Sequence, residues 1–313
     1  MLQVVLAKPR GFCAGVERAI HIVEAALEKF GPPIYVRHEI VHNQRVVQGL
    51  RQRGVIFVDD IEQIPDGAIT VFSAHGVSKK VESGALEQGL NAIDATCPLV
   101  SKVHREGQRY AKKGYEIILI GHRNHPEVEG TLGQIPGKVH LVGDIEDVSN
   151  LDVENPEKVA YITQTTLSVD DTREIISALK NRFPAIAGPD IKDICYATQN
   201  RQTAVRKLAE QVDALLVVGA SNSSNSNRLC EVGNDNGIDS YLVESPEAID
   251  RHWIEGVNTI GITAGASTPE ELVEGVIERL REFDSVEVST MSGITENVKF
   301  TLPNELQEYA HLH

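Results

Sequence analysis

The chain alternates short apolar runs with amphipathic stretches along most of its length. Runs of four or five aliphatic residues are typical of strands buried on both faces. They recur before segments in which apolar residues repeat every three or four positions, as in helices. In the first example an apolar run at 4–7 is followed by a helical pattern from Val16 to Phe30, which Gly31 and Pro32 end. This alternation predicts an α/β fold with mainly parallel sheets.

Further strands are expected at the other apolar runs, most of which end in polar loops. They lie at 34–40, 55–58, 68–72, 116–120, 139–142, 159–162, 214–218, 241–243 and 259–262. Helices are expected between most of them, and Pro269 opens the last long one. Beyond about Asp284 the pattern lapses into a polar tail, for which we expect a strand and an arm.

A cysteine stands at the start of three of the expected helices. Cys13 follows the first strand, and Cys97 and Cys195 follow the segments 91–96 and 191–194, which we expect to be strands. Successive cysteines are separated by about the length of one small α/β unit, which indicates an internal repeat. At a helix N-terminus the unpaired N–H groups favour the thiolate, the form that binds metal or attacks a substrate.

The repeat predicts three α/β lobes related by a pseudo-threefold axis. The expected bounds are 14–96 for the first lobe, 97–193 for the second and 194–283 for the third, which the N-terminal strand 1–13 joins. Residues 284–313 form the tail. In open parallel sheets ligands bind at the carboxyl ends of the strands. With this symmetry the strand-end loops converge on one central cavity.

The composition narrows the classes of function. The chain has 313 residues, 24% of them charged, and a formal net charge of −15. No apolar run approaches the roughly 18 residues of a membrane span. The apolar stretch before Lys8 is too short for a signal peptide, so we expect a cytoplasmic protein without membrane contact. The negative charge argues against a nucleic-acid partner, which requires a basic stripe, and any anion site must be built locally.

Four widely spaced cysteines in such a chain are not a disulfide framework. Three at equivalent positions suit a [4Fe–4S] cluster with one iron left open, because these clusters take thiolate ligands. Zinc is an alternative, although its sites usually contain closely spaced ligand pairs and the chain has no Cys-x-x-Cys. The third possibility, a small core residue, suits Cys230 inside its helical stretch better than it suits the other three.

The strand-end loops hold histidines and hydroxyl residues that could bind an anion. Loops of small hydroxyl residues at helix N-termini are suited to phosphate. The candidates are His42, His75, His125, Thr165, Thr166, Ser223, Ser224, Asn225 and Ser267. A flexible, solvated loop is the alternative for the Ser/Asn run 221–227, and composition alone favours it.

Glu127 is the carboxylate in these loops that could supply protons. It follows His125 and Pro126 at a strand-to-helix turn, and Glu129 should point elsewhere. The alternative is an ordinary first-turn glutamate that complements the helix dipole.

Several motifs together resemble the 4-hydroxy-3-methylbut-2-enyl diphosphate reductase family. They are GFCAGVERA around Cys13, EIVHN at His42, SAHGV at His75, DATCPLV at Cys97, HPEVEGT at Glu127, TQTTLSVDDT from Thr163, DICYATQNRQ around Cys195, SNSSNSNRL from Ser221 and TAGAST at Ser267. The resemblance runs from near the N-terminus to about residue 281 and shows no departure at a functional position.

The resemblance implies three α/β lobes around one oxygen-sensitive [4Fe–4S] cluster per chain, with Cys13, Cys97 and Cys195 as ligands. It implies that the substrate hydroxyl binds the open iron and that Glu127 and Thr165 form the proton relay. Two electrons from a carrier such as ferredoxin or flavodoxin and the first of two protons remove the hydroxyl as water. Protonation of the allyl anion then gives isopentenyl and dimethylallyl diphosphate, the last step of the non-mevalonate pathway. The implied diphosphate-binding residues are His42, His75, His125, Ser223, Ser224, Asn225 and Ser267, with Thr165 beside them.

Two other classes of function stay open on the residues alone. One is a non-redox [4Fe–4S] dehydratase or synthase that acts on a small anionic substrate, in which the open iron polarises a hydroxyl. The other is a sensor of metal or phosphate that binds without catalysis. The sequence is compatible with a monomer or a homodimer.

Overall fold

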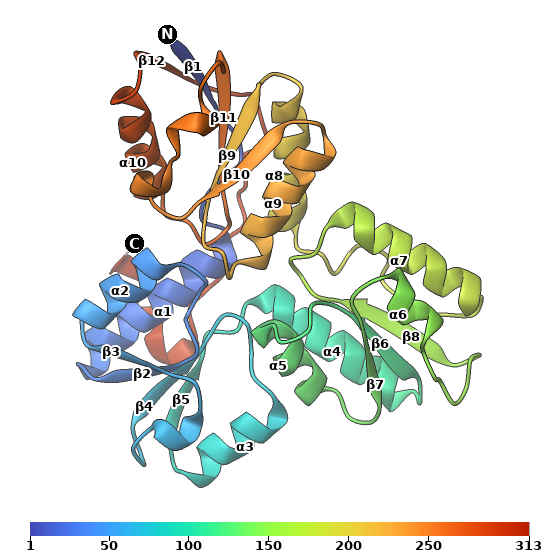
Figure 1. Cartoon of the computed structure of the whole chain (residues 1–313). Helices are drawn as coiled ribbons and strands as arrows, with labels where there is room; N and C mark the ends of the chain where they lie inside the picture. Colours follow the sequence, from blue (N-terminus) through green and yellow to red (C-terminus); the bar gives the residue numbers. More distant parts are fainter. Residues whose placement is uncertain (313) are drawn as a thin grey trace. The chain divides into compact units, whose positions relative to one another are not determined.

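The computed structural model describes residues 1–312, so only the last residue of the predicted 284–313 tail lies outside it. It contains three sheets, and every strand pairing among these residues is parallel. Helices flank each sheet (Figure 1). The predicted α/β class with parallel sheets is therefore confirmed. The chain divides into two compact units, described separately below.

The first unit comprises Met1–Ala14, His42–Val46 and Tyr196–Lys299. Its five-stranded sheet has the order β10-β9-β11-β1-β12. The strands are β1 (Leu2–Leu6), β9 (Ala214–Val218), β10 (Asp239–Val243), β11 (Thr259–Ala264) and β12 (Val286–Thr290). The helices are α8 (Tyr196–Ala209), α9 (Ser224–Asp235) and α10 (Glu270–Arg281), with short 3₁₀ turns at Pro246–Ala248 and Arg251–Trp253.

Alternate side chains of this sheet fill two cores, which explains its nearly unbroken apolar strands. Leu216 and Val218 of β9 pack with α10, whereas Leu215 and Val217 pack with α8 and α9. The helices accordingly lie on opposite faces of the sheet (Figure 1). Because both faces are covered, nearly every position of the interior strands β9 and β11 is buried, as expected for a parallel sheet, whereas the edge strand β12 is mostly exposed.

The second unit comprises Gly15–Val41, Val47–Cys195 and the chain from Phe300 onward, and it holds two sheets. One has the order β3-β2-β4-β5 and the other β7-β6-β8. The strands are β2 (Ile34–Arg37), β3 (Val55–Val58), β4 (Ile69–Phe72), β5 (Asn91–Asp94), β6 (Glu116–Ile120), β7 (Val139–Val142) and β8 (Val159–Thr163). The main helices are α1 (Ala14–Phe30), α2 (Gln44–Gln52), α3 (Lys79–Glu87), α4 (Pro98–Lys112), α5 (Pro126–Gln134), α6 (Ile145–Ser149) and α7 (Val169–Arg182). Two 3₁₀ helices lie at Ile61–Gln63 and Asn304–Leu312.

The three sheets repeat one connection pattern. In each, a strand pairs with the next strand along the chain on one side and with the strand after that on the other: β2 with β3 and β4, β6 with β7 and β8, and β9 with β10 and β11. The carboxyl ends of the central strands are therefore equivalent in each sheet, as the internal repeat predicts. The proposed lobe boundaries and the threefold axis stay predictions.

One expected strand is wrong. The segment before Cys195 is a turn closed by Lys192 N–H to Pro189 and by Ile194 N–H to Ile191, at 3.3 and 3.1 Å. Asp190 has a φ of 60°, a left-handed conformation that interrupts an extended strand.

The tail after Asp284 was the least defined part of the sequence. The structure places β12 beside β1, so the tail adds an edge strand to the first unit's sheet. The expected strand in this region is therefore confirmed.

Candidate active site

Each predicted cysteine ligand lies directly before a helix and is held by its own backbone. Cys13, Cys97 and Cys195 precede α1, α4 and α8 and are partly exposed. Each donates its N–H to a loop that follows another strand: Cys13 to Ala266 at 3.2 Å, Cys97 to Ala74 at 3.0 Å, and Cys195 to Thr165 at 2.9 Å. In each loop the acceptor or the residue after it is another predicted site residue. A backbone hydrogen bond therefore ties each cysteine to a loop that carries another residue of the predicted site.

The fourth cysteine has a different setting. Cys230 lies within α9 and packs against the core that α8 and α9 share with the sheet. Burial raises the pKa of its thiol to about 12. Cys230 is therefore a core-type thiol, as its helical position predicts.

In the first unit, the loop after β11 contacts the segment before α2. Ser267 Oγ donates to the main-chain carbonyl of His42 at 2.9 Å. The neighbouring Asn43 is buried, and its Oδ1 accepts the N–H groups of Arg45 and Val46 at 3.1 and 3.2 Å, at the start of α2. This cap fixes the backbone that carries His42.

The Ser/Asn run is not the solvated loop that composition alone favours, because from Ser223 onward it forms the start of α9. Ser223 is the N-cap, and its Oγ accepts the N–H of Ser226 at 3.3 Å and the Ser226 hydroxyl at 3.1 Å. Ser226 is fully buried, and a Cβ built on Gly265 would lie 2.1 Å from its Oγ. Glycine at 265 thus lets the α9 N-terminus approach the loop after β11.

Asn225, in this first turn, carries an unsatisfied amide. Its side chain is 4% exposed, yet neither Oδ1 nor Nδ2 has a hydrogen-bond partner within residues 1–312. Leaving a buried polar group unpaired costs about 1–3 kcal/mol. Such a group is an exception among native side chains and is consistent with a polar ligand at the N-terminus of α9.

In the second unit, Glu127 and Thr165 form a direct pair. Glu127 lies in the first turn of α5, and its side chain is 3% exposed. Its Oε1 accepts the N–H of Thr165 at 2.7 Å, and its Oε2 accepts the Thr165 hydroxyl at 2.9 Å. The two residues therefore form a bidentate contact at the end of β8, beside the carbonyl that holds Cys195.

The environment of Glu127 makes it an acid near neutral pH. Burial raises the pKa of its carboxyl to about 7, although the two hydrogen bonds from Thr165 act in the opposite direction. A group with this pKa holds and releases a proton at neutral pH, as a general acid must. The interpretation of Glu127 as only a helix-dipole partner does not explain its burial. Glu129, in the same turn, is exposed.

Two of the candidate histidines lie next to each other in this unit. The rings of His75 and His125 meet edge to face with centroids 5.8 Å apart. His125 Nδ1 accepts the N–H of Glu127 at 3.1 Å, so its neutral ring carries the proton on Nε2. The Ser73 hydroxyl lies 3.2 Å from His75 Nδ1. These contacts hold both imidazoles in defined orientations.

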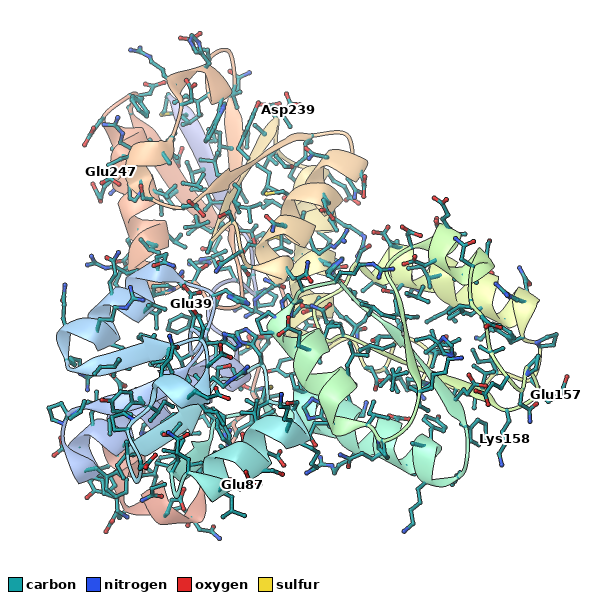
Figure 2. All side chains as sticks on the ribbon, turned by 60° about the horizontal axis from the view of Figure 1, so that its bottom comes forward. Glu39, Glu87, Glu157, Lys158, Asp239 and Glu247 are labelled. Atoms are coloured by element: carbon teal, nitrogen blue, oxygen red, sulfur yellow. The ribbon has the colours of Figure 1, made fainter. Side chains whose placement is uncertain are left out.

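Several exposed carboxylates project outward from their elements, among them Glu87, Glu157, Asp239 and Glu247 (Figure 2). Glu127, in contrast, is buried. Glu127 therefore differs in setting from these surface carboxylates.

Sequence reasoning missed two buried polar residues that support the site. Ser226 lies within a quoted motif but was not selected, although its position three residues after an N-cap serine is a signal for a capping contact. Arg201 lies in the motif around Cys195, and no local pattern indicates that it is fully buried.

These features define a parallel α/β protein whose loops carry thiols directly before helices, oriented imidazoles and a buried acid of neutral pKa. A family model described as "LytB protein" matches residues 4–281. The curated relatives include 4-hydroxy-3-methylbut-2-enyl diphosphate reductase 2 of Bradyrhizobium diazoefficiens, 58% identical over 97% of this chain and 99% of the relative. The 4-hydroxy-3-methylbut-2-enyl diphosphate reductase of Zymomonas mobilis is 56% identical over 98% of this chain and 90% of the relative.

Solved structures agree with this. The E-1-hydroxy-2-methyl-but-2-enyl-4-diphosphate reductase from Plasmodium falciparum has a TM-score of 0.94 and 41% identity, covering 99% of this chain and 98% of that one. A second structure, of (E)-4-hydroxy-3-methyl-but-2-enyl diphosphate reductase, "the terminal enzyme of the non-mevalonate pathway", has a TM-score of 0.64 and 33% identity over 90% of this chain and 100% of that one. The chain belongs to the LytB family of 4-hydroxy-3-methylbut-2-enyl diphosphate reductases.

Membership of this family implies an iron–sulfur cofactor. The donors present fit such a group, because thiols that precede helices and are held by their own amides can serve as oriented thiolate ligands. No cluster of three or more His, Cys, Asp or Glu that could hold a metal ion is found in residues 1–312. The ligand assignment stays a prediction. Across the same residues no helix is long and apolar enough to cross a membrane.

Proposed function

We propose that the protein reduces (E)-4-hydroxy-3-methylbut-2-enyl diphosphate to isopentenyl and dimethylallyl diphosphate, as the last step of the non-mevalonate isoprenoid pathway. The observation that carries the proposal is the buried Glu127–Thr165 pair, an acid with a pKa of about 7 at the end of a parallel strand. The names of relatives that match almost the whole chain support it.

The cofactor in this proposal is one [4Fe–4S] cluster with Cys13, Cys97 and Cys195 as its protein ligands. When bound, the cluster would pass electrons from the external donor to the substrate and would supply a Lewis-acidic iron with an open position. The recurrence of one backbone contact at all three cysteines supports the assignment, since the main chain of each cysteine is held in the same way.

The proposed diphosphate-binding residues are hydrogen-bond donors, and three of them lie at the N-terminus of α9. They are His42, His75, His125, Ser223, Ser224, Asn225 and Ser267. The unpaired amide of Asn225 supports this role, because its Nδ2 can donate to a phosphate oxygen. The Nε2 proton of His125 is suited to the same purpose.

Glu127 and Thr165 are the proposed proton path. The overall change consumes two electrons and two protons: the C–O bond breaks, the hydroxyl leaves as water, and the allylic carbon skeleton takes up the second proton at either end. Glu127 holds the proton in a site without bulk water, and the Thr165 hydroxyl, 2.9 Å away, can pass it onward. Thr165 is expected to contact the substrate as well.

The electrons come from an external carrier such as ferredoxin or flavodoxin in this proposal. The monomer or homodimer state and the cytoplasmic location stay predictions.

Reductant consumption by the anaerobic enzyme tests the function. The reductase should use two electrons for each product molecule formed. A non-redox dehydratase would form product with no reductant present, and a sensor would bind the substrate without forming product. Either of these results would reject the proposal.

A further inference from the structure

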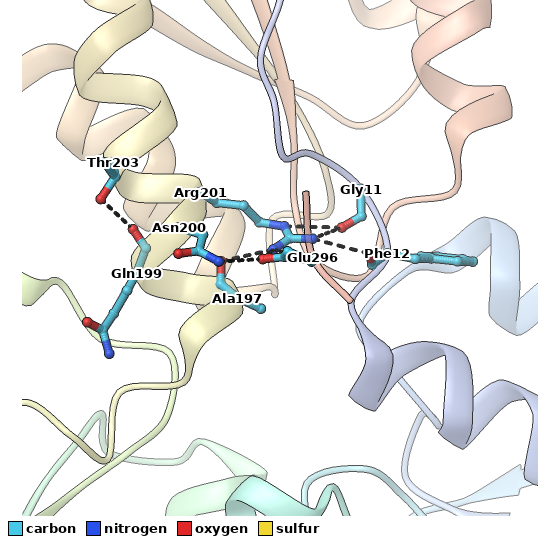
Figure 3. Close-up of polar contacts among 8 residues, drawn as sticks. All are labelled: Gly11, Phe12, Ala197, Gln199, Asn200, Arg201, Thr203 and Glu296. Carbon is cyan, nitrogen blue, oxygen red and sulfur yellow. Dashed lines mark hydrogen bonds and ion pairs between the residues drawn. The ribbon is translucent and has the colours of Figure 1, made fainter. Parts of the chain in front are cut away.

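Arg201 is the largest fully buried side chain in the described part of the chain, with 0% exposure. It lies in the second turn of α8, the helix that follows Cys195. Its guanidinium reaches the segment just before Cys13 (Figure 3). Its contacts all lie within the first unit.

All five N–H groups of the guanidinium are used. Nε and Nη2 donate to the carbonyl of Gly11 at 3.1 and 2.7 Å, and Nη2 also donates to the carbonyl of Phe12 at 3.2 Å. Nη1 donates to the carbonyl of Ala197 at 2.9 Å and to the two carboxylate oxygens of Glu296 at 3.2 and 3.3 Å. Figure 3 shows these bonds as dashed lines. The planar guanidinium carries its donors on three separate nitrogens and can reach all these acceptors together. Lysine carries its three N–H groups on a single nitrogen and cannot do so.

The counter-ion comes from the tail. Glu296 is held by a second donor, Asn200 Nδ2 at 2.9 Å. The tail lies close to the segment before Cys13, since a Cβ built on Gly293 would be 2.0 Å from the carbonyl oxygen of Lys8. The tail thus neutralises a buried charge next to the cysteine-bearing loop.

The peptide bond between Phe12 and Cys13 is held from both sides. Its carbonyl accepts from Arg201, and its N–H donates to Ala266 at 3.2 Å. Because the peptide unit is planar, fixing both groups fixes its plane and the direction in which Cys13 leaves it. Burying a guanidinium is unfavourable unless it is fully paired, and an apolar side chain could fill the same space. The buried charge is fully paired here, and its bonds converge on the main chain just before Cys13.

We propose that Arg201, with Glu296 as its counter-ion, is a positioning residue for the thiolate of Cys13, and that the tail segment 293–296 is part of the cofactor-holding structure. This inference rests on the iron–sulfur cofactor of the proposed function. It concerns how firmly the cluster is held.

The test compares the holoprotein with the variants Arg201→Lys and Glu296→Gln, and with Lys207→Gln as a control on an exposed position of α8. The first measurement is the rate at which an iron chelator removes iron under anaerobic, non-denaturing conditions. Outer-shell partners of metal ligands are worth about 10–100-fold in metal affinity or activity, so release from Arg201→Lys should be at least about tenfold faster. Glu296→Gln should also be faster, and Lys207→Gln should match the wild type.

Hydrogen exchange separates positioning from general destabilisation. In both variants amides of the segment 8–14 should exchange faster, while those of the interior strand β9 keep their wild-type protection. The electron paramagnetic resonance spectrum of the reduced cluster should change as well.

Wild-type iron release in both variants would overturn the inference, as would faster release accompanied by faster exchange throughout β9. If Arg201→Lys does not fold, Glu296→Gln decides by the same two measurements. If the wild-type protein binds no cluster after anaerobic reconstitution, the proposed cofactor itself is rejected. If the cluster binds but is lost at the same rate in the wild type and both variants, only the role of Arg201 is rejected.

Discussion

Replacing Glu127 by glutamine should remove the proton donor while leaving the site intact. A glutamine side chain has the size of glutamate, its Oε1 can still accept the N–H of Thr165, and the Thr165 hydroxyl can turn to accept from the new amide. Only the transferable proton is lost. General acid catalysis is worth about 10²–10⁴-fold, so turnover should fall by at least about 100-fold.

The pKa of the wild-type carboxyl sets the expected pH dependence. With a pKa of about 7, half of the Glu127 side chains carry a proton at pH 7. Well above that pH the protonated fraction falls about tenfold per pH unit, and turnover should follow it. The Glu127→Gln variant should lack this decline, and Glu129→Gln, which alters an exposed side chain, should keep it.

The raised pKa of Glu127 also makes a stability prediction. An unfolded glutamate loses its proton near its ordinary pKa of 4.5, whereas the folded Glu127, with a pKa of about 7, keeps its proton to higher pH. The folded state therefore loses stability as the pH rises through this window, by about 3 kcal/mol in total at 1.36 kcal/mol per pKa unit. Glu127→Gln should remove this contribution from the free energy of unfolding.

The assay is anaerobic turnover with a strong artificial reductant between pH 6 and 10, with the cluster absorption recorded in every sample. Unchanged absorption shows that the variant keeps its cofactor. If Glu127→Gln retains more than a tenth of the wild-type rate with an intact cluster, Glu127 is not the acid. If the wild-type rate shows no decline above pH 7, the assigned pKa does not control turnover.

Three further predictions concern the ligands, the anion site and the buried histidine. Cys13→Ser, like serine at the other two predicted ligands, should abolish the visible cluster absorption and turnover, whereas Cys230→Ser should keep both, and iron analysis of anaerobic samples checks this. Asn225→Ala should weaken substrate binding by about 10–150-fold, since a hydrogen bond to a charged group is worth about 1.5–3 kcal/mol; inorganic diphosphate should compete in the wild type, and equal binding of an alcohol without the diphosphate would contradict the assignment. Burial lowers the pKa of His104 to about 4, so its stabilising contribution should be lost as the pH falls from 6.5 through 4; His104→Asn should reduce that acid sensitivity in urea unfolding.

Local pattern was sufficient for most elements of the fold. Val55–Val58, Glu116–Ile120 and Ala214–Val218 are strands with the expected bounds, and the helix at Ala14–Phe30 ends where Gly31 and proline follow it. These elements are determined by side-chain periodicity and by backbone restrictions, both of which act over a few residues. The strand expected before Cys195 is wrong, because the apolar residues of that segment lie in a turn that follows the left-handed Asp190.

Much of the site's chemistry could also be predicted, because residue types limit what a loop can do. The sequence indicated Glu127 as a proton donor and the Ser/Asn run as an anion site. It left open that Glu127 only complements a helix dipole and that the Ser/Asn run is a solvated loop. Burial argues against those alternatives: a 3% exposed Glu127 has a raised pKa, and a 4% exposed Asn225 has no partner in residues 1–312, although the roles themselves stay predictions. Exposure depends on every element packed around a side chain, which a local pattern does not contain.

The sequence by itself determined the α/β class, the position of each cysteine before a helix and the family. The tertiary structure alone revealed the hydrogen bonds by which Thr165 holds Glu127, 38 residues away in the chain, and that Arg201 holds the carbonyl of Gly11 from 190 residues along the chain. It also revealed that the polar tail supplies the counter-ion Glu296. The physical reason is that periodicity records which face of an element is buried, whereas the partner of a polar group is chosen by how the elements pack.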